Sequence, residues 1–224
     1  MKRSLLLCLF LLIGLSRPIS AQQTYEPPKA AAAGDAYVPY QIVVDGLFVL
    51  DVSLDDGGGV SRIHALRDPG SMLGAAKTSI RGWKFQPASR GGKPEPSRIT
   101  VSFVYRPPNH GGARAAPPRD FSPVLPPDEP GSRVHGDYVP VGILSFAYPD
   151  YPVNSVAWGS VVVQLTVDKS GEITGVDFLH GLAGFNNFVS DALKKWRFQA
   201  ATLNNKTIAS KTVIAFIFQT PSSN

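Results

Sequence analysis

The chain has 224 residues, of which 43% are hydrophobic and 17% charged, and its net charge is +5. This length suits one or two domains, and the 20 prolines and 21 glycines indicate that part of the chain is linker. The lysines and arginines are scattered rather than gathered in one run, so we predict no nucleic-acid binding. A basic surface instead favours anionic polymers or acidic partners.

The N-terminal segment has the pattern of a secretory signal. A basic start precedes an apolar stretch over residues 5–15, and Ala21 comes before a polar segment. The stretch is shorter than the about 20 residues that a membrane-spanning helix needs. We therefore predict a signal peptide over residues 1–21 and an exported, periplasmic protein. The alternative is an uncleaved anchor in the inner membrane, because Ile19 is not the small residue usual near a cleavage site.

Three segments have the composition of connectors. Residues 22–36 contain prolines and an alanine run, and we predict a short N-terminal tether there. Residues 107–147 are dense in proline, which favours an extended backbone that buries no core. We predict a Pro-rich linker over this segment and a short tail over residues 220–224.

An internal repeat organises the rest of the chain. The segment WKFQPA at residues 83–88 recurs as WRFQAA at residues 196–201, 113 positions later. The same offset holds without a gap over a whole domain length, which chance similarity would not do. Two homologous domains are therefore predicted, over residues 37–106 and 148–219.

The second copy predicts a strand, a strand, a helix and a strand. Residues 161–167 are rich in β-branched side chains, and residues 173–179 return after a turn that contains Gly171. Apolar residues at spacings of three and four over residues 185–196 predict an amphipathic helix, and residues 211–218 form the last strand. The fold class is therefore α+β, a small antiparallel three-stranded sheet packed with one helix.

The first copy predicts the same unit, with strands over residues 48–54, 60–66 and 98–105 and a helical stripe over residues 72–83. Its stripe has smaller side chains, so we expect the looser packing there. Large aromatic residues at the ends of both stripes are predicted to lie in the core rather than on a binding surface. They are Trp83, Phe85, Trp196 and Phe198.

No residues have the spacing of a catalytic or metal centre. The only cysteine, Cys8, lies in the predicted signal, so the mature chain has no thiol and no disulfide. The four histidines lack the close spacing of a zinc site. Asp55 and Asp168 resemble a carboxylate pair, but they occupy equivalent hairpin turns, which an aspartate stabilises. We predict no enzyme, no cofactor and no metal.

Short motifs follow one order in both copies. The second has Tyr-Pro at residues 151–152, Val-Asp-x-x-Gly at 167–171 and Trp-Arg-Phe at 196–198, and the first has Trp-x-Phe-x-Pro-Ala at 83–88. These motifs resemble the TonB C-terminal domain family and imply tandem TonB-like domains. Three departures are the second domain, the expected loss of the membrane helix that the family's energy transducers keep, and a stretch between Tyr151 and Gly159 that is shorter than the family's usual helical lead-in.

The last strand of a small sheet is often an edge that can accept a partner strand. The resemblance implies that such pairing captures a segment of an outer-membrane TonB-dependent transporter. We thus expect partner binding by strand addition at Lys211, Val213, Ala215 and Ile217, with Arg98, Thr100 and Ser102 as counterparts.

The resulting prediction is a non-enzymatic envelope protein associated with TonB-dependent transport. One alternative is a cell-wall (peptidoglycan) binding module that uses the basic surface. Another, if the N-terminal segment is retained, is a membrane-anchored energy transducer.

Overall fold

The computed structural model describes residues 24–38, 44–68, 72–106, 119–120, 137–152, 155 and 157–219. The predicted signal peptide, the prolines of the predicted linker other than Pro140, and the predicted tail lie outside these residues.

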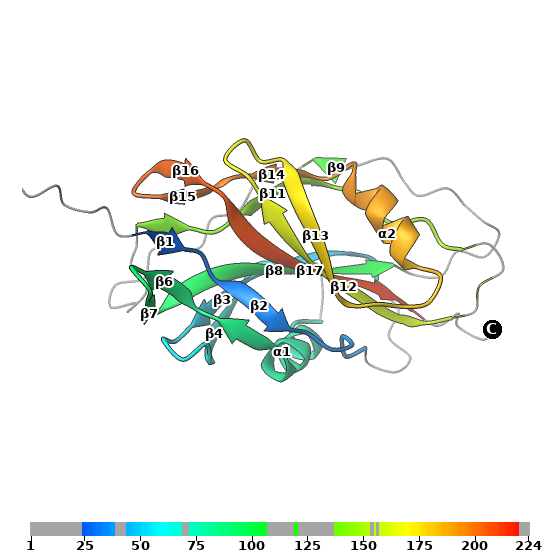
Figure 1. The fold of residues 1–224 in the computed structure, drawn as a ribbon. Helices are drawn as coiled ribbons and strands as arrows, with labels where there is room; N and C mark the ends of the chain where they lie inside the picture. Colours follow the sequence, from blue (N-terminus) through cyan, green and yellow to red (C-terminus); the bar gives the residue numbers. More distant parts are fainter. Residues whose placement is uncertain are drawn as a thin grey trace, which may run out of the picture.

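A six-stranded sheet forms the centre of the molecule, in the order β13-β12-β17-β8-β3-β4 (Figure 1). Its strands are β3 (Gly46–Leu54), β4 (Val60–Arg67), β8 (Ser97–Arg106), β12 (Gly159–Val167), β13 (Ile173–His180) and β17 (Ser210–Phe218). Neighbouring strands are antiparallel except β8 and β17, which are parallel. Each half of the sheet thus has the predicted three antiparallel strands, and the halves join through their last strands.

Short strands and two helices surround this sheet. The helices are α1 (Leu73–Gly82) and α2 (Asn186–Leu193). The short strands before the second half are β1 (Tyr25–Glu26), β2 (Lys29–Ala32), β5 (Lys84–Gln86), β6 (Ala88–Arg90), β7 (Lys93–Glu95) and β9 (Arg119–Asp120). Those of the second half are β10 (Tyr138–Val139), β11 (Gly142–Phe146), β14 (Arg197–Gln199), β15 (Ala201–Leu203) and β16 (Lys206–Ile208).

The order of elements repeats along the chain. Apart from β9, every element from β10 to β17 begins 113 residues after its counterpart between β1 and β8. We call residues 25–106 the N-terminal half and residues 138–218 the C-terminal half. The repeat in structure therefore begins earlier in each half than the predicted domain boundaries at residues 37 and 148.

The predicted tether is wrong for the part of the chain that the structure describes. Residues 29–32 form β2, which pairs with β5, and the alanines of this segment lie in the core. Ala30, Ala33 and Ala36 are at most 7% exposed. Small side chains let this backbone lie directly on the sheet, and the amide of Ala30 donates to the Gln164 side chain of β12 at 2.8 Å. A low-complexity alanine run thus has a packing function.

The end of the predicted linker is also folded. Its residues 138–139 and 142–146 form β10 and β11, which pair with β15 and β14. Val141, Ile143 and Phe146 are at most 2% exposed. These apolar residues follow the proline-dense stretch, so composition averaged over the whole linker concealed them.

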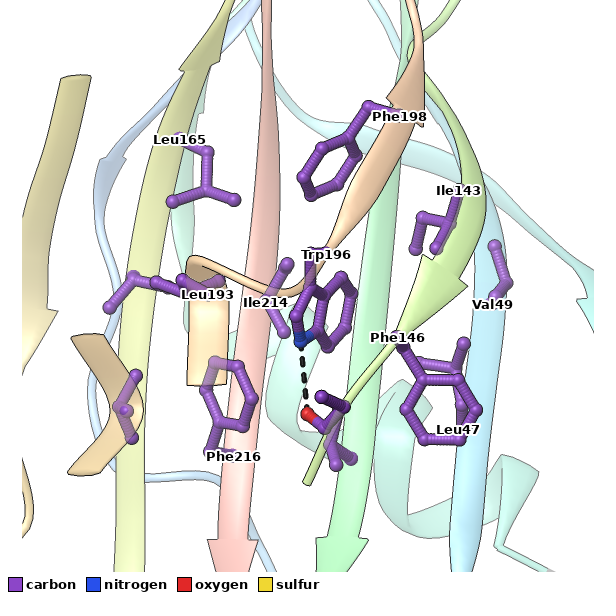
Figure 2. Close-up of a cluster of buried hydrophobic side chains, with 14 of the residues drawn as sticks. Leu47, Val49, Ile143, Phe146, Leu165, Leu193, Trp196, Phe198, Ile214 and Phe216 are labelled. Carbon is purple, nitrogen blue, oxygen red and sulfur yellow. Dashed lines mark hydrogen bonds between the residues drawn. The ribbon is translucent and has the colours of Figure 1, made fainter. Parts of the chain in front are cut away.

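Both faces of the sheet are covered. Figure 1 shows α1 and β2 on one side, and α2, β11 and β14 on the other. Each covering layer contacts strands of both halves. Leu47 and Val49 of β3 belong to the same core as Trp196 (Figure 2). On the opposite face, Ala215 of β17 belongs to the core of α1. The two halves therefore share both of their hydrophobic cores.

The four aromatic residues at the ends of the helical stripes are buried. Trp83, Phe85, Trp196 and Phe198 are at most 6% exposed. The Trp196 and Phe198 rings stack with centroids 5.8 Å apart. The indole Nε1 of Trp196 donates to the carbonyl of Ala147 at 3.0 Å, as Figure 2 shows. Their role is core packing.

Candidate functional site

The strands predicted to recognise a partner are internal. β17 lies between β12 and β8, and its residues from Val213 to Phe218 pair in parallel with residues 101–106 of β8. The side chains of Val213, Ala215 and Ile217 are 0% exposed. The prediction that these strands are sheet edges is therefore wrong. By itself, the last strand of each half would have backbone N–H and C=O groups without partners. In this chain the last strand of the other half pairs with them.

Arg98 belongs to a polar cluster at the start of β8. Its guanidinium forms an ion pair with Asp51, 3.0 Å away, and both side chains are at most 12% exposed. Nearby, the hydroxyls of Tyr138 and Ser210 are 2.7 Å apart. Burial raises the pKa of Tyr138 to about 12, so it stays neutral. This cluster joins β3, β8, β10 and β17 and contains no exposed nucleophile.

The other predicted partner-binding residues also have internal contacts. The Thr100 hydroxyl donates to the carbonyl of Val141 at 2.7 Å, and the Thr212 hydroxyl donates to the carbonyl of Thr100 at 2.9 Å. Ser102 is fully buried. The Lys211 ammonium donates to a threonine hydroxyl of β12 at 3.0 Å. The bonds of Thr100 and Thr212 join the two halves, whereas the Lys211 bond lies within the C-terminal half.

The outer strands of the sheet are β13 and β4. On β13, Val176 and Phe178 are 38% and 40% exposed, although they stand opposite buried residues of β12. On β4, the equivalent Ile63 and Ala65 are half-buried, and α1 packs against this strand. The edge of the C-terminal half is therefore the more open and more apolar of the two.

The two aspartates with equivalent positions stabilise hairpin turns. Asp55 Oδ1 accepts the amides of Gly57 and Gly59 at 2.9 and 2.7 Å. Asp168 Oδ1 accepts the Ser170 hydroxyl at 2.6 Å and the Glu172 amide at 3.0 Å. The two turns lie in different halves, and neither carboxylate is positioned to work with the other.

We expect Asp168 to make stability depend on pH in the acid range. The hydrogen bond from the Ser170 hydroxyl, followed by bonds from the Glu172 and Ser170 amides, lowers the pKa of Asp168. A lowered folded pKa stabilises the fold above the unfolded pKa of about 3.9, and this contribution disappears as the pH falls through the folded pKa. The free energy of unfolding of Asp168→Asn should therefore approach that of the wild type between pH 6 and pH 2.

Urea unfolding of both proteins across this range measures the difference. Ser170→Ala is the matched control, because it removes the largest cause of the shift and should weaken the pH dependence. A difference between wild type and Asp168→Asn that is constant with pH would contradict the assignment.

The sequence patterns did not identify two exposed aromatic residues. Tyr37 is 53% exposed and Trp158 is 61% exposed. The repeat contains a signal that identifies them. At the offset of 113 residues, Tyr37 aligns with Asp150 and Trp158 aligns with Asp45. Aromatic residues that align with aspartates are not required by the fold.

Among the described residues no group of three or more His, Cys, Asp and Glu side chains is placed to hold a metal ion. His110 and His135 lie outside those residues. None of the helices that the structure describes has the length and hydropathy for crossing a membrane.

Residues 145–220 match the family model for the Gram-negative bacterial TonB protein C-terminal. The match covers about a third of the chain and includes β12, β13, α2 and β14 to β17. The resemblance of the second copy to this family is thus confirmed, and a second TonB-like domain in the N-terminal half stays a prediction. Comparisons with curated proteins and with solved structures find no match.

Proposed function

We propose that this chain is an exported TonB-like envelope protein that binds a segment of a partner protein by β-strand addition at β13. The TonB-like C-terminal domain supports the protein class. The open, apolar edge formed by Val176 and Phe178 carries the assignment of the surface. This edge replaces β8 and β17 as the place where a partner strand would pair.

The chemistry of this edge suits an extended peptide. A strand with one neighbour leaves half of its backbone N–H and C=O groups for a partner, and these groups supply affinity. Val176 and Phe178 are two residues apart on one strand and therefore face the same side. A segment with apolar residues at alternate positions would cover both side chains while its backbone extends the sheet.

The opposite edge is less suited to this task. α1 packs against β4, and β4 begins and ends near exposed arginines, Arg62 and Arg67. Charged side chains and a covering helix are common ways of protecting an edge from strand pairing. The two halves have thus diverged, and we assign partner binding to the C-terminal half.

The proposed partner is an envelope protein, and an outer-membrane TonB-dependent transporter is the partner that the family resemblance implies. The part of the partner that pairs with β13 would be an extended segment near a terminus or in a loop, which can detach from the rest of the partner's fold. Such a segment would lose conformational entropy on pairing, which gives moderate affinity and fast exchange.

The edge can be tested by crosslinking in cells. A photoreactive amino acid replaces Asp177, whose side chain is 62% exposed on β13. We expect it to capture an outer-membrane protein, and we expect the double substitution Val176→Lys and Phe178→Lys to lower the yield at least tenfold. The two lysines remove the apolar contacts and place charge at the edge.

Ser61→Lys on β4 is the control, because it adds a lysine to the other outer strand of the sheet. Its crosslinking yield should equal that of the parent protein. Equal yields with and without the β13 lysines, in proteins of unchanged melting temperature, would contradict strand addition at this edge.

A further inference from the structure

Tyr37 and Trp158 are large aromatic residues that the fold leaves in solvent. Their exposed fractions, 53% and 61%, are the highest among the large hydrophobic residues in the described part of the chain. Tyr37 follows the segment that crosses the sheet after β2, and Trp158 directly precedes β12. Tyrosine and tryptophan are enriched where protein surfaces bind partners, because each has an apolar ring and a polar group.

Hydrogen bonds bring the two residues to one end of the sheet. The amide of Ala36 donates to the Ser160 hydroxyl of β12 at 2.8 Å, and the amide of Tyr37 donates to the Ser79 hydroxyl of α1 at 2.8 Å. The backbone at Tyr37 is therefore fixed at the level of Ser160, two residues after Trp158. The N-terminal half supplies one ring and the C-terminal half the other.

Polar groups lie close to both positions in the chain. The Ser160 hydroxyl donates to the carboxylate of Asp35. The imidazole Nε2 of His180 lies 3.8 Å from Asp35 Oδ1, and these two side chains are 34% and 57% exposed. Hydrogen-bonding groups with solvent access thus accompany the two rings.

The repeat shows that the fold does not need aromatic residues here. The positions equivalent to Tyr37 and Trp158 are Asp150 and Asp45, and both aspartates are exposed. The same backbone therefore accepts small charged side chains at both positions. Packing of the fold therefore does not require the rings of Tyr37 and Trp158.

We propose that Tyr37 and Trp158, together with Asp35 and His180, bind a polysaccharide, the amino-sugar glycan of the bacterial cell wall. A pyranose ring has a face of C–H groups that stacks on an aromatic ring, and hydroxyls at its rim that bond to carboxylate and imidazole groups. An apolar peptide would instead cover the exposed polar groups of Asp35 and His180 without offering them hydrogen bonds of its own.

This inference does not depend on strand addition. Val176 and Phe178 stand opposite Leu165 and Val163, whereas a bulge between Val162 and Val163 places His180 opposite Val162, which belongs to the other core. The test uses the chain without residues 1–21 and chitotetraose, a soluble chain of four amino-sugar rings, as the probe. Trp83 and Trp196 are each 6% exposed, so a change in tryptophan fluorescence during the titration reports on Trp158. We expect a saturable change with a dissociation constant in the millimolar range, on the order of −4 kcal/mol of binding free energy.

The substitution Trp158→Asp copies the residue at the equivalent position of the N-terminal half, so the protein should fold. Trp158→Asp also removes the fluorophore, so calorimetry is used to measure the affinity of this variant for chitotetraose. We expect that affinity to be at least tenfold lower than that of the parent protein. Tyr37→Ala should weaken the fluorescence titration similarly. Phe178→Ala, a 40% exposed aromatic residue on the other surface, should bind chitotetraose as the parent does. Absence of a saturable change in the parent, or unchanged affinity in Trp158→Asp, would overturn the site.

Purified cell-wall sacculi test the source of the glycan. The parent protein should sediment with them, and Trp158→Asp should stay in the supernatant. Binding of chitotetraose without any sedimentation on sacculi would overturn the cell wall as the source. Loss of crosslinking at β13 would leave both results unchanged, so failure of the two proposals can be told apart.

Discussion

Residues 137–224 expressed without the N-terminal half should not form a stable monomer. Four fully buried residues of the C-terminal half, Val162, Val213, Ala215 and Ile217, belong to the core that α1 and β2 cover. Exposure of each larger apolar side chain costs about 1.5–3 kcal/mol. The loss from these residues is then roughly as large as the 5–15 kcal/mol that stabilises a typical domain.

Light scattering after size-exclusion chromatography measures this directly. We expect the isolated C-terminal half to elute as a dimer or as larger assemblies, because its uncovered face and the free edge of β17 would pair with a second copy. The chain without residues 1–21 is the control and should retain the mass of one chain. A monomeric C-terminal half with a single cooperative thermal transition would contradict the shared cores.

Gly171→Ala should be among the most destabilising single substitutions outside the core. A Cβ at this position would lie 2.3 Å from the carbonyl oxygen of Phe198, and Gly171 has a φ of +90°. Neither the backbone of β14 nor the turn can move away without breaking the hairpin. We expect a loss of about 2–4 kcal/mol, from the steric clash together with the positive φ.

Thermal unfolding of three variants separates these causes. Gly184→Ala has a similar φ of +82° with nothing within 4 Å of the added Cβ, so it should lose only about 1–2 kcal/mol. Gly58→Ala, with a Cβ 2.3 Å from the Phe85 carbonyl oxygen, should behave like Gly171→Ala. Equal losses for Gly171→Ala and Gly184→Ala would show that the close approach to β14 has no energetic effect.

The sequence predicted the six long strands and both helices because their signals are local. β-Branched runs, helical spacing and the turn glycines Gly58 and Gly171 depend on nearby residues alone. The short strands β5 to β7 and β14 to β16 have three residues each and carry no usable period. Ala30 was interpreted as part of a tether because an alanine run has the same composition whether it lies on a sheet or in solvent.

The position of the candidate site could not be predicted from either half by itself. Which strand becomes an edge depends on how two segments more than a hundred residues apart pair, and a pattern within β8 or β17 does not encode that choice. A proline at Ala215, which would test an edge strand, instead tests folding in this structure, because Ala215 is in the middle of the sheet. Phe178 was assigned to a strand without any indication of its exposure.

The junction between β8 and β17 also has a consequence for how the protein responds to dilution. Two separate molecules joined by the same strands would come apart at low concentration, in proportion to their dissociation constant. Here both strands belong to one chain, so each meets the other at an effective concentration set by the connecting segment. β8 and β17 therefore stay paired however few copies a cell contains, and the outer strand β13 keeps the same geometry at every expression level.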